Sequence, residues 1–227
     1  MYEARGVQQN TVSAKGQLSN SSLLHIFRAQ QASIRILFVG NSITYHAPKP
    51  AIGWNGSWGM AASCKDNDYV HQTVKRLSER YSAVSYGIAQ VASWETSFDE
   101  NGEAWKEPYL KVSDFRPDVV VIRLGENISS GKLEALDVRP YIEDMIKFFG
   151  AGSRQIIVTD CFWRRDKLDQ IFKQICDDKG YTFCRLSDLY SNQEAMALNE
   201  FEHQGVSLHP SDYGMALIAE RIAKCVR

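Results

Sequence analysis

The sequence predicts an α/β protein in which a parallel sheet lies between two layers of helices. Two observations predict this fold. Five short apolar segments of strand length recur along the chain, and most of the gaps between them carry helical patterns. Strands that alternate with helices form right-handed βαβ units, and helices then cover both faces of the sheet. A length of 227 residues suits one domain of this kind.

The first predicted strand is the apolar run Ile34-Arg35-Ile36-Leu37-Phe38-Val39, which ends at Gly40. A short, almost continuous apolar run of this kind is typical of a parallel strand buried on both faces. Four more segments have the same character. They are Ala83–Ala89, Asp118–Leu124, Gln155–Thr159 and Thr182–Leu186.

The predicted helices are the segments whose apolar residues recur every three or four positions. They are Tyr69–Tyr81, Leu133–Phe149, Arg165–Lys179 and Ser211–Val226. This spacing places the apolar side chains on one face of each helix, which packs on the sheet. Residues 1–32 lack such periodicity, so we expect a loosely ordered N-terminal tail with at most one helical turn around Ser22–Ala29. The domain itself is expected to span residues 33–227.

The composition is that of an ordinary globular protein, with 23% charged residues and a formal net charge of -1. We expect no nucleic-acid or membrane-surface partner, because both usually require a basic patch. No stretch approaches the roughly 20 apolar residues of a membrane span. Met1–Lys15 has no apolar run of signal-peptide type, so we expect a cytoplasmic protein. The five cysteines are widely spaced and form no CxxC pair, which favours free thiols and predicts no metal site.

The loop after the first strand is a candidate nucleophile site. In parallel sheets, ligands bind at the carboxyl ends of the strands, and Ser42 lies there in Gly40-Asn41-Ser42-Ile43-Thr44. A serine hydroxyl becomes a good nucleophile only when a base lies within hydrogen-bond reach. Taken alone, the loop is better explained as a helix N-cap, because Asn and Ser are common caps.

Two further segments carry side chains that suit acyl chemistry. His209 precedes Pro210, which favours an extended backbone just before the last helix, from which an imidazole could reach the sheet edge. Asn127 follows the most apolar strand, and its amide could face a developing oxyanion. The alternatives are a surface histidine at a helix start and a turn asparagine that caps its own backbone.

Together, and in this order, these segments resemble the SGNH/GDSL hydrolase family of GDSL-like lipases and acylhydrolases. The loop around Ser42 is similar to the family's first block, Gly125-Glu126-Asn127 to the third, and His209–Met215 to the last. The resemblance covers about Ile34 to Val226. It implies a flavodoxin-like, five-stranded parallel sheet, a Ser42 nucleophile and a His209 base, with neither metal nor organic cofactor.

The resemblance also implies an oxyanion hole made by the backbone N–H of Ser42, the side chain of Asn127 and a second backbone N–H. The family provides this last donor from a glycine of the second block. Here the position falls on Gln90, or else on Ala89. A backbone N–H does not require glycine, so the role can persist.

One departure concerns the group that orients His209. The family usually places an Asp three residues before the histidine, and this chain has Val206 there. A backbone carbonyl near Val206 or Ser207 could replace it, or the protein could work as a weak Ser–His dyad or not at all. A third alternative is a carboxylate from elsewhere, with candidates Glu126, Glu95 and Asp212. We favour the carbonyl, because a buried imidazole N–H must find an acceptor.

The segment 45–63 is rich in proline and glycine, which prevents a long helix. Its Trp54 and Trp58 could form a platform for sugar rings or acyl chains, or they could equally anchor the loop to the domain. Trp94 is expected at the same rim. The other candidate substrate contacts lie beside the catalytic blocks and are Asn41 and Glu126. His46 competes as a base but ranks below His209, because the nearby prolines disfavour the helix it would need.

The sequence therefore predicts a serine esterase that cleaves small esters, with O-acetyl groups on carbohydrate as one candidate class, through an acyl-enzyme. An acyltransferase would use the same intermediate. The competing hypothesis is a catalytically weak or inactive protein that binds a carbohydrate or a partner, and Val206 is the residue that motivates it.

Overall fold

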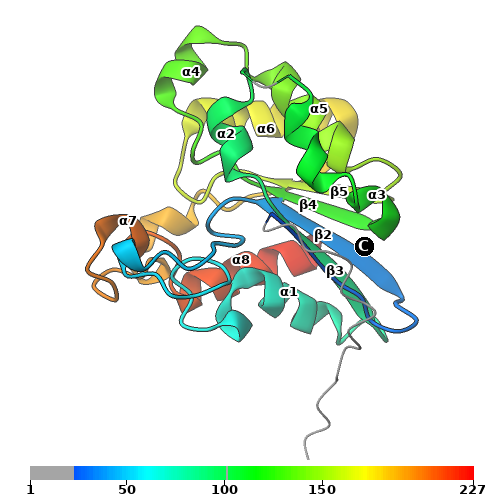
Figure 1. Ribbon diagram of the computed structural model, residues 1–227, viewed down its shortest axis with the longest axis horizontal. Helices are drawn as coiled ribbons and strands as arrows, with labels where there is room; N and C mark the ends of the chain where they lie inside the picture. Colours follow the sequence, from blue (N-terminus) through cyan, green and yellow to red (C-terminus); the bar gives the residue numbers. More distant parts are fainter. Residues whose placement is uncertain (1–22, 101) are drawn as a thin grey trace, which may run out of the picture.

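The computed structural model describes residues 23–100 and 102–227, and a six-stranded sheet lies at its centre (Figure 1). The strand order is β1-β3-β2-β4-β5-β6. The strands are β1 Leu24–Phe27, β2 Ile34–Gly40, β3 Val84–Gln90, β4 Val119–Arg123, β5 Gln155–Thr159 and β6 Thr182–Cys184. All five strands expected from the apolar runs are present, with ends that differ by at most two residues.

Strands β2 to β6 are parallel, and their order is the doubly wound, flavodoxin-like one. This confirms the expected α/β architecture. The sixth strand, β1, pairs antiparallel with β3, with Leu24 opposite Ala89. The expected helical turn around Ser22–Ala29 is therefore wrong. The residues of β1 instead cover the edge of β3, whose backbone groups would otherwise lack partners on that side. The remainder of the expected tail, residues 1–22, lies outside the described residues.

Helices cover both faces of the sheet (Figure 1). The α-helices are α1 Tyr69–Leu77, α2 Ala92–Ser97, α3 Val112–Phe115, α4 Ser130–Ala135, α5 Arg139–Phe149, α6 Asp166–Lys179, α7 Gln204–Ser207 and α8 Asp212–Cys225. Short 3-10 helices span Pro50–Ile52, Lys65–Asn67, Ala104–Tyr109, Leu189–Ser191 and Gln193–Ala195. The single helix predicted over Leu133–Phe149 is divided into α4 and α5, because Pro140 lies in the first turn of α5 and suits a helix start.

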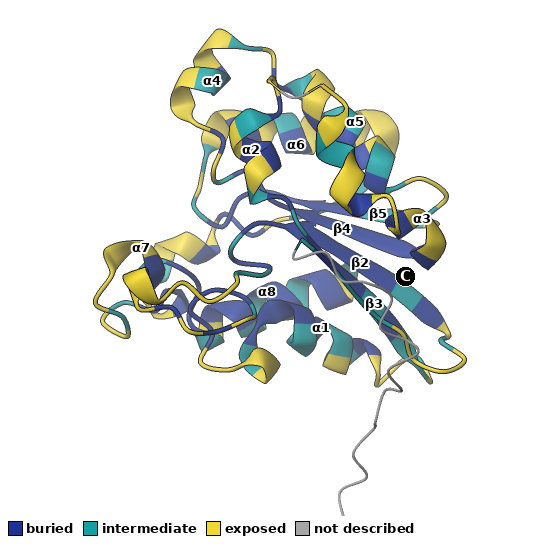
Figure 2. Cartoon of the chain, in the orientation of Figure 1, coloured by how far each residue is buried: buried dark blue, intermediate teal, exposed yellow. Residues whose placement is uncertain are grey.

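The sheet separates two apolar cores, and its central strands β2 and β4 are buried along almost their whole length (Figure 2). In β2, Leu37 and Val39 pack with α2, α5 and α6, whereas Ile36 and Phe38 pack with α1 and α8. This alternation follows from the two-residue period of a strand. Because β2 and β4 are buried at their carboxyl ends, the loops that follow them start from rigid positions.

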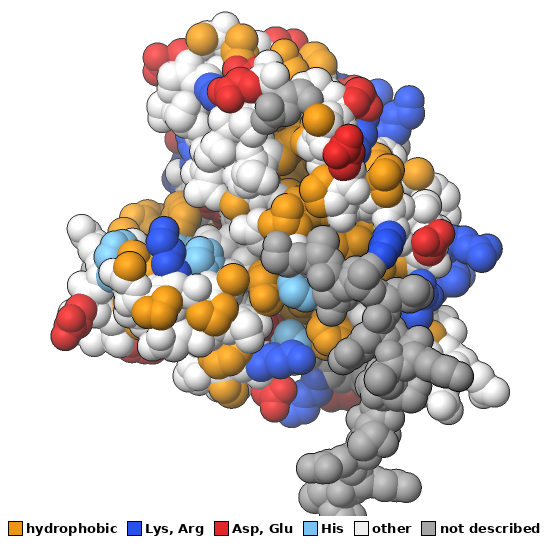
Figure 3. Space-filling model, in the orientation of Figure 1, with side chains coloured by type: hydrophobic (Ala, Val, Ile, Leu, Met, Phe, Trp, Pro, Cys, Tyr) orange, Lys and Arg blue, Asp and Glu red, His pale blue; other side chains and the backbone are white. Residues whose placement is uncertain are grey.

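On the face shown in Figure 3, both basic and acidic side chains are scattered over the surface. No helix in the described ranges has both the length and the apolar content needed to cross a bilayer.

Candidate active site

Ser42 and His209 meet at the carboxyl edge of the sheet. Ser42 Oγ lies 2.8 Å from His209 Nε2, although the two residues are 167 positions apart. Ser42 remains partly accessible, whereas only 6% of His209 is exposed. The two residues that the sequence singled out as nucleophile and base are therefore within hydrogen-bond distance of each other.

The Ser42 loop is a tight turn that leaves β2 at Gly40. A Cβ on Gly40 would lie 2.0 Å from Thr44 Oγ1 and 2.4 Å from the carbonyl oxygen of Arg123, so only glycine fits. The N–H groups of Thr44 and Tyr45 both donate to the carbonyl of Asn41. No α-helix follows this turn. The helix-cap interpretation of Ser42 is therefore wrong, because its hydroxyl contacts an imidazole instead.

A backbone carbonyl orients His209. The Nδ1–H donates to the carbonyl oxygen of Gly205 at 2.7 Å, which leaves the Nε2 lone pair facing Ser42. The acceptor lies one residue before the expected Val206–Ser207 pair, in the short helix α7. Asp212 is engaged elsewhere, because its carboxylate accepts from Ser63 and Asn67.

Val206 itself belongs to an apolar cluster. Its side chain is fully buried, and the other buried members of the cluster are Trp54, Met60, Ala61 and Ala197. The position of the family's aspartate is thus surrounded by apolar groups. The alternative base His46 is occupied within its own loop, where its Nδ1–H donates to the Ala47 carbonyl at 2.5 Å.

His209 is held neutral by its surroundings. Burial lowers its pKa to about 4, and the positive charge of Arg123 contributes in the same direction. The Trp163 ring and the imidazole pack in a T-shaped arrangement with centroids 5.1 Å apart, and the indole N–H donates to the Leu208 carbonyl at 3.0 Å. A neutral imidazole with a fixed tautomer is the form that can accept the serine proton.

Two of the expected oxyanion donors are available and one is not. The N–H of Ser42 has no hydrogen-bond partner among the described residues, and the side chain of Asn127 is exposed. The N–H of Gln90, however, donates to the Leu23 carbonyl at 2.8 Å, so the assignment of Gln90 to the oxyanion hole is wrong. The alternative, Ala89, is internal to β3, where it pairs with both neighbouring strands.

The N-terminus of α2 lies where the Gln90 donor was expected. The N–H of Val91 donates to the Gly40 carbonyl at 2.7 Å, which brings the next residues beside the Ser42 loop. Ala92 and Ser93 are at least partly accessible, and no described residue accepts a hydrogen bond from either N–H. The first N–H groups of a helix have no intrahelical acceptor and suit an anion.

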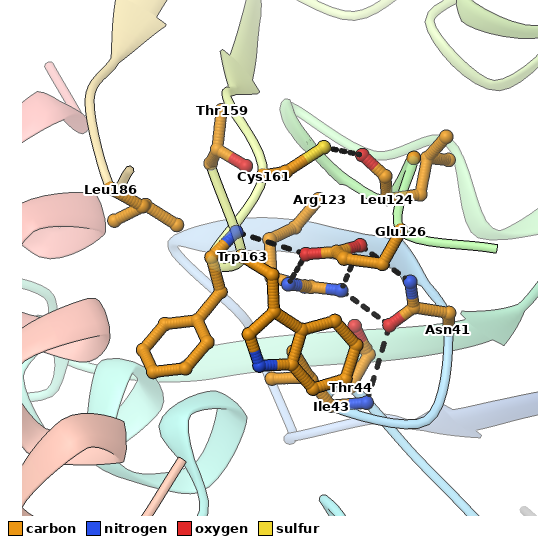
Figure 4. A network of polar contacts seen from close by, with 12 residues as sticks. Asn41, Ile43, Thr44, Arg123, Leu124, Glu126, Thr159, Cys161, Trp163 and Leu186 are labelled. Carbon is orange, nitrogen blue, oxygen red and sulfur yellow. Dashed lines mark hydrogen bonds and ion pairs between the residues drawn. The ribbon is translucent and has the colours of Figure 1, made fainter. Parts of the chain in front are cut away.

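A buried ionic network lies directly beneath the site (Figure 4). Arg123, at the end of β4, donates to both carboxylate oxygens of Glu126 at 2.7 and 3.1 Å and also to the Asn41 side-chain oxygen. The Asn41 amide donates to Glu126 at 2.6 Å. Burial raises the pKa of Glu126, but the Arg123 charge and the hydrogen bonds from Arg123, Phe162 and Asn41 together outweigh it, so the pKa is lowered.

This network corrects the expectation that Asn41 and Glu126 contact substrate. Arg123 is fully buried, and the side chain of Glu126 is only 1% exposed. Most of their polar atoms bond within this network, which braces the Ser42 loop against β4, whereas Arg123 Nε has no hydrogen-bond partner among the described residues. Sequence reasoning overlooked Arg123. The available signal was an arginine at the end of an otherwise apolar strand, which requires a buried anionic partner.

The aromatic rim differs from the expectation. Trp54 and Trp94 are each 2% exposed and pack in apolar clusters, so their predicted contact with substrate is wrong. Trp58 is partly exposed, but its indole N–H donates to the Ala62 carbonyl at 2.8 Å. The tryptophans of segment 45–63 therefore anchor that loop, which is the alternative that the sequence left open. Trp163 is the partly exposed tryptophan that contacts His209.

The described residues form neither a metal-binding group nor a disulfide bond. Within residues 23–100 and 102–227, no three His, Cys, Asp or Glu side chains are grouped to hold a metal ion. The five cysteines are free thiols in the structure.

Comparison with solved structures finds several proteins that share this fold. An acetylxylan esterase, Axe2 from Geobacillus stearothermophilus, matches with a TM-score of 0.54 and 16% identity over 86% of this chain and 94% of that one. A lipase/acylhydrolase from Enterococcus faecalis matches with a TM-score of 0.55 and 16% identity, over 84% and 94%. The psychrotrophic esterase EstA from Pseudoalteromonas sp. matches with a TM-score of 0.53 and 16% identity, over 85% and 96%.

The sequence itself matches no family model, and no curated protein is significantly similar to it. The structural matches nevertheless show that the chain has the α/β/α fold of the SGNH/GDSL hydrolases, as the three sequence blocks implied. These structural neighbours are esterases and acylhydrolases.

Proposed function

We propose that the protein is a serine esterase in which Ser42 is the nucleophile and His209 the general base. The observation that carries this proposal is the 2.8 Å contact between Ser42 Oγ and His209 Nε2 at the carboxyl edge of the sheet. Ser42 Oγ bonds to the ester carbonyl carbon while its proton passes to His209 Nε2. The imidazolium then protonates the leaving alcohol, and water cleaves the acyl-enzyme by the same route in reverse.

The Gly205 carbonyl performs the orienting part of the missing aspartate's role. In serine hydrolases that lose this carboxylate, the wrong imidazole tautomer accounts for much of the lost rate. Here the Nδ1–H is fixed by Gly205 at 2.7 Å, so the tautomer is correct. A neutral carbonyl stabilises the imidazolium less than a carboxylate does. We therefore expect a slower enzyme that acts on esters rather than on amides, whose leaving groups require more assistance.

The oxyanion hole in this proposal has three donors. They are the N–H of Ser42, the side-chain amide of Asn127 and the N–H of Ala92 at the start of α2. Ala92 replaces Gln90, because the Gln90 N–H is used by Leu23. Each such donor is worth about 10²–10³-fold in rate.

Small esters are the substrate class we favour. O-acetyl groups on carbohydrate are the leading candidate, supported by the likeness to an acetylxylan esterase and by the partly exposed indole of Trp163 beside His209. An acyltransferase would use the same acyl-enzyme with an alcohol in place of water. Hydrolysis of p-nitrophenyl acetate against that of acetylated xylo-oligosaccharides measures the preference.

The test is the comparison of wild-type protein with Ser42→Ala and His209→Asn on p-nitrophenyl acetate, together with labelling by a fluorophosphonate. We expect loss of hydrolysis in both variants, loss of labelling in Ser42→Ala and slow labelling in His209→Asn. The lack of a carboxylate on His209 favours a competing candidate, a binding protein that retains only the fold. Wild-type labelling no faster than that of Ser42→Ala would establish that alternative and refute the esterase.

A further inference from the structure

Glu95 is a buried carboxylate next to the candidate oxyanion hole. It lies on α2, one turn after Ala92, and the residue is completely buried. Burying an ionised carboxylate costs several kcal/mol unless hydrogen bonds satisfy its oxygens. Burial and the nearby charge of Glu126 both raise the pKa of Glu95, which shows how costly its ionised form is at this position.

Every hydrogen bond of the Glu95 carboxylate comes from the loops of the candidate active site. One oxygen, Oε1, accepts from the Gly125 N–H at 2.5 Å, the Asn127 N–H at 3.4 Å and the Asn41 amide at 3.1 Å. The other oxygen, Oε2, accepts from the Asn127 side-chain amide at 2.6 Å. The carboxylate therefore joins the start of α2, the Ser42 loop and the turn after β4.

The turn after β4 is bent so that its donors reach Glu95. Gly125 has φ of 126°, a conformation that side chains disfavour. A Cβ there would also lie 2.8 Å from Leu168 and 2.9 Å from the Cys161 sulfur. The turn is thus built around glycine, and its backbone directs the N–H of Gly125 and the amide of Asn127 at one buried carboxyl group.

This arrangement leaves one N–H of the Asn127 amide unused. Asn127 is exposed, and an exposed asparagine side chain normally rotates in solvent. The 2.6 Å bond to Glu95 ties one amide N–H, and no other described residue accepts from this amide. An oxyanion donor contributes most when its position is fixed before reaction begins, because no reorganisation is then needed.

We propose that Glu95 is a positioning residue, which holds the Asn127 amide so that its second N–H faces the oxyanion formed at Ser42. The inference rests on the proposed esterase function. It assigns Glu95 no contact with substrate. It also differs from the role first considered for Glu95, since the carboxylate orients the amide of Asn127 and not the imidazole of His209.

The test is a double-mutant cycle between Glu95 and Asn127. In Glu95→Gln, one carboxylate oxygen becomes an NH₂ group that opposes an N–H donor. We expect kcat on p-nitrophenyl acetate to fall roughly 10–100-fold, since a misplaced group costs that much, while KM changes less than about threefold. Asn127→Ala should lose about 10²–10³-fold in kcat. The double variant should be no slower than Asn127→Ala alone, because Glu95 acts through Asn127.

Asp160→Asn is the matched control. Asp160 is also a buried carboxylate, and it accepts from the N–H groups of Leu186 and Ser187. Its loss should lower the melting temperature without the drop in kcat. A purely structural Glu95 would give effects that multiply with those of Asn127→Ala, and this result would overturn the proposal.

A second variant keeps the inference testable where Glu95→Gln does not fold. Glu95→Asp retains the charge and withdraws the carboxylate by one methylene, so the Asn127 contact breaks. We expect the same kcat loss, and full kcat would overturn the role of Glu95. If the wild-type hydrolysis does not depend on Ser42, the proposed function fails as well. If it does depend on Ser42 and only the Glu95 cycle is multiplicative, the inference about Glu95 alone is refuted.

Discussion

Val206→Asp places a carboxylate where the family usually carries one. The side chain of Val206 is fully buried among Trp54, Met60 and Ala61, and His209 Nδ1 already donates to Gly205. The new carboxylate would lie in an apolar cluster without a donor. An uncompensated buried charge costs about 3–5 kcal/mol, so we expect a loss of this size in the free energy of unfolding at pH 7.

Burial raises the pKa of the introduced carboxyl in the folded state above the unfolded value of about 3.9. The loss of stability is therefore small near pH 4, where the buried carboxyl stays protonated, and it grows as the pH rises further toward the folded-state pKa. The assays are urea unfolding at pH 4 and pH 7, and kcat/KM on p-nitrophenyl acetate. Val206→Asn is the control, because it has the same shape without the charge and should lose less stability at pH 7. A stable Val206→Asp protein with kcat/KM tenfold above wild type would refute this reasoning.

Two other predictions concern buried titratable groups. His209 must be neutral to act as base, and burial lowers its pKa to about 4, so kcat/KM should stay level down to about pH 5 and fall through an apparent pKa near 4. A fall centred near pH 6.5 in the pH–rate profile would contradict this. Arg123→Met should lower the free energy of unfolding by about 3–5 kcal/mol, because it leaves Glu126 buried and unpaired. Adding Glu126→Gln should recover part of that loss in urea unfolding, and no recovery would contradict the pairing.

The parallel sheet could be predicted because burial on both faces demands apolar runs. Residues 34–39, 118–124 and 155–159 have the length and β-branched content of buried strands, and each appears as a strand within one residue of its predicted bounds. β1 was missed for the opposite reason. It has four residues with only Leu24 fully buried, and its stability comes from pairing with β3, which no local pattern in residues 24–27 reports.

The missed strand also explains the wrong oxyanion donor. The resemblance placed the second-block donor at Gln90, and that role requires a backbone N–H without a partner in the sheet. Once the chain just before β1 lies beside β3, the Leu23 carbonyl takes the Gln90 N–H, and the first unpaired donors fall at Ala92 and Ser93 in α2. A local catalytic assignment thus depended on the strand order of the whole sheet.

The group that orients His209 also could not be predicted from the local sequence pattern. A carboxylate partner is visible in a sequence, whereas every residue has a carbonyl, so the pattern alone could not place the acceptor. Gly205 is four residues before His209, and the helical turn of α7 brings its carbonyl to the imidazole as such a turn brings a carbonyl to the N–H four residues later. Val206 then occupies the inner side of that turn, where packing favours an apolar residue. The absence of the family's aspartate is therefore weak evidence against catalysis, because the same turn that buries Val206 provides the replacement acceptor.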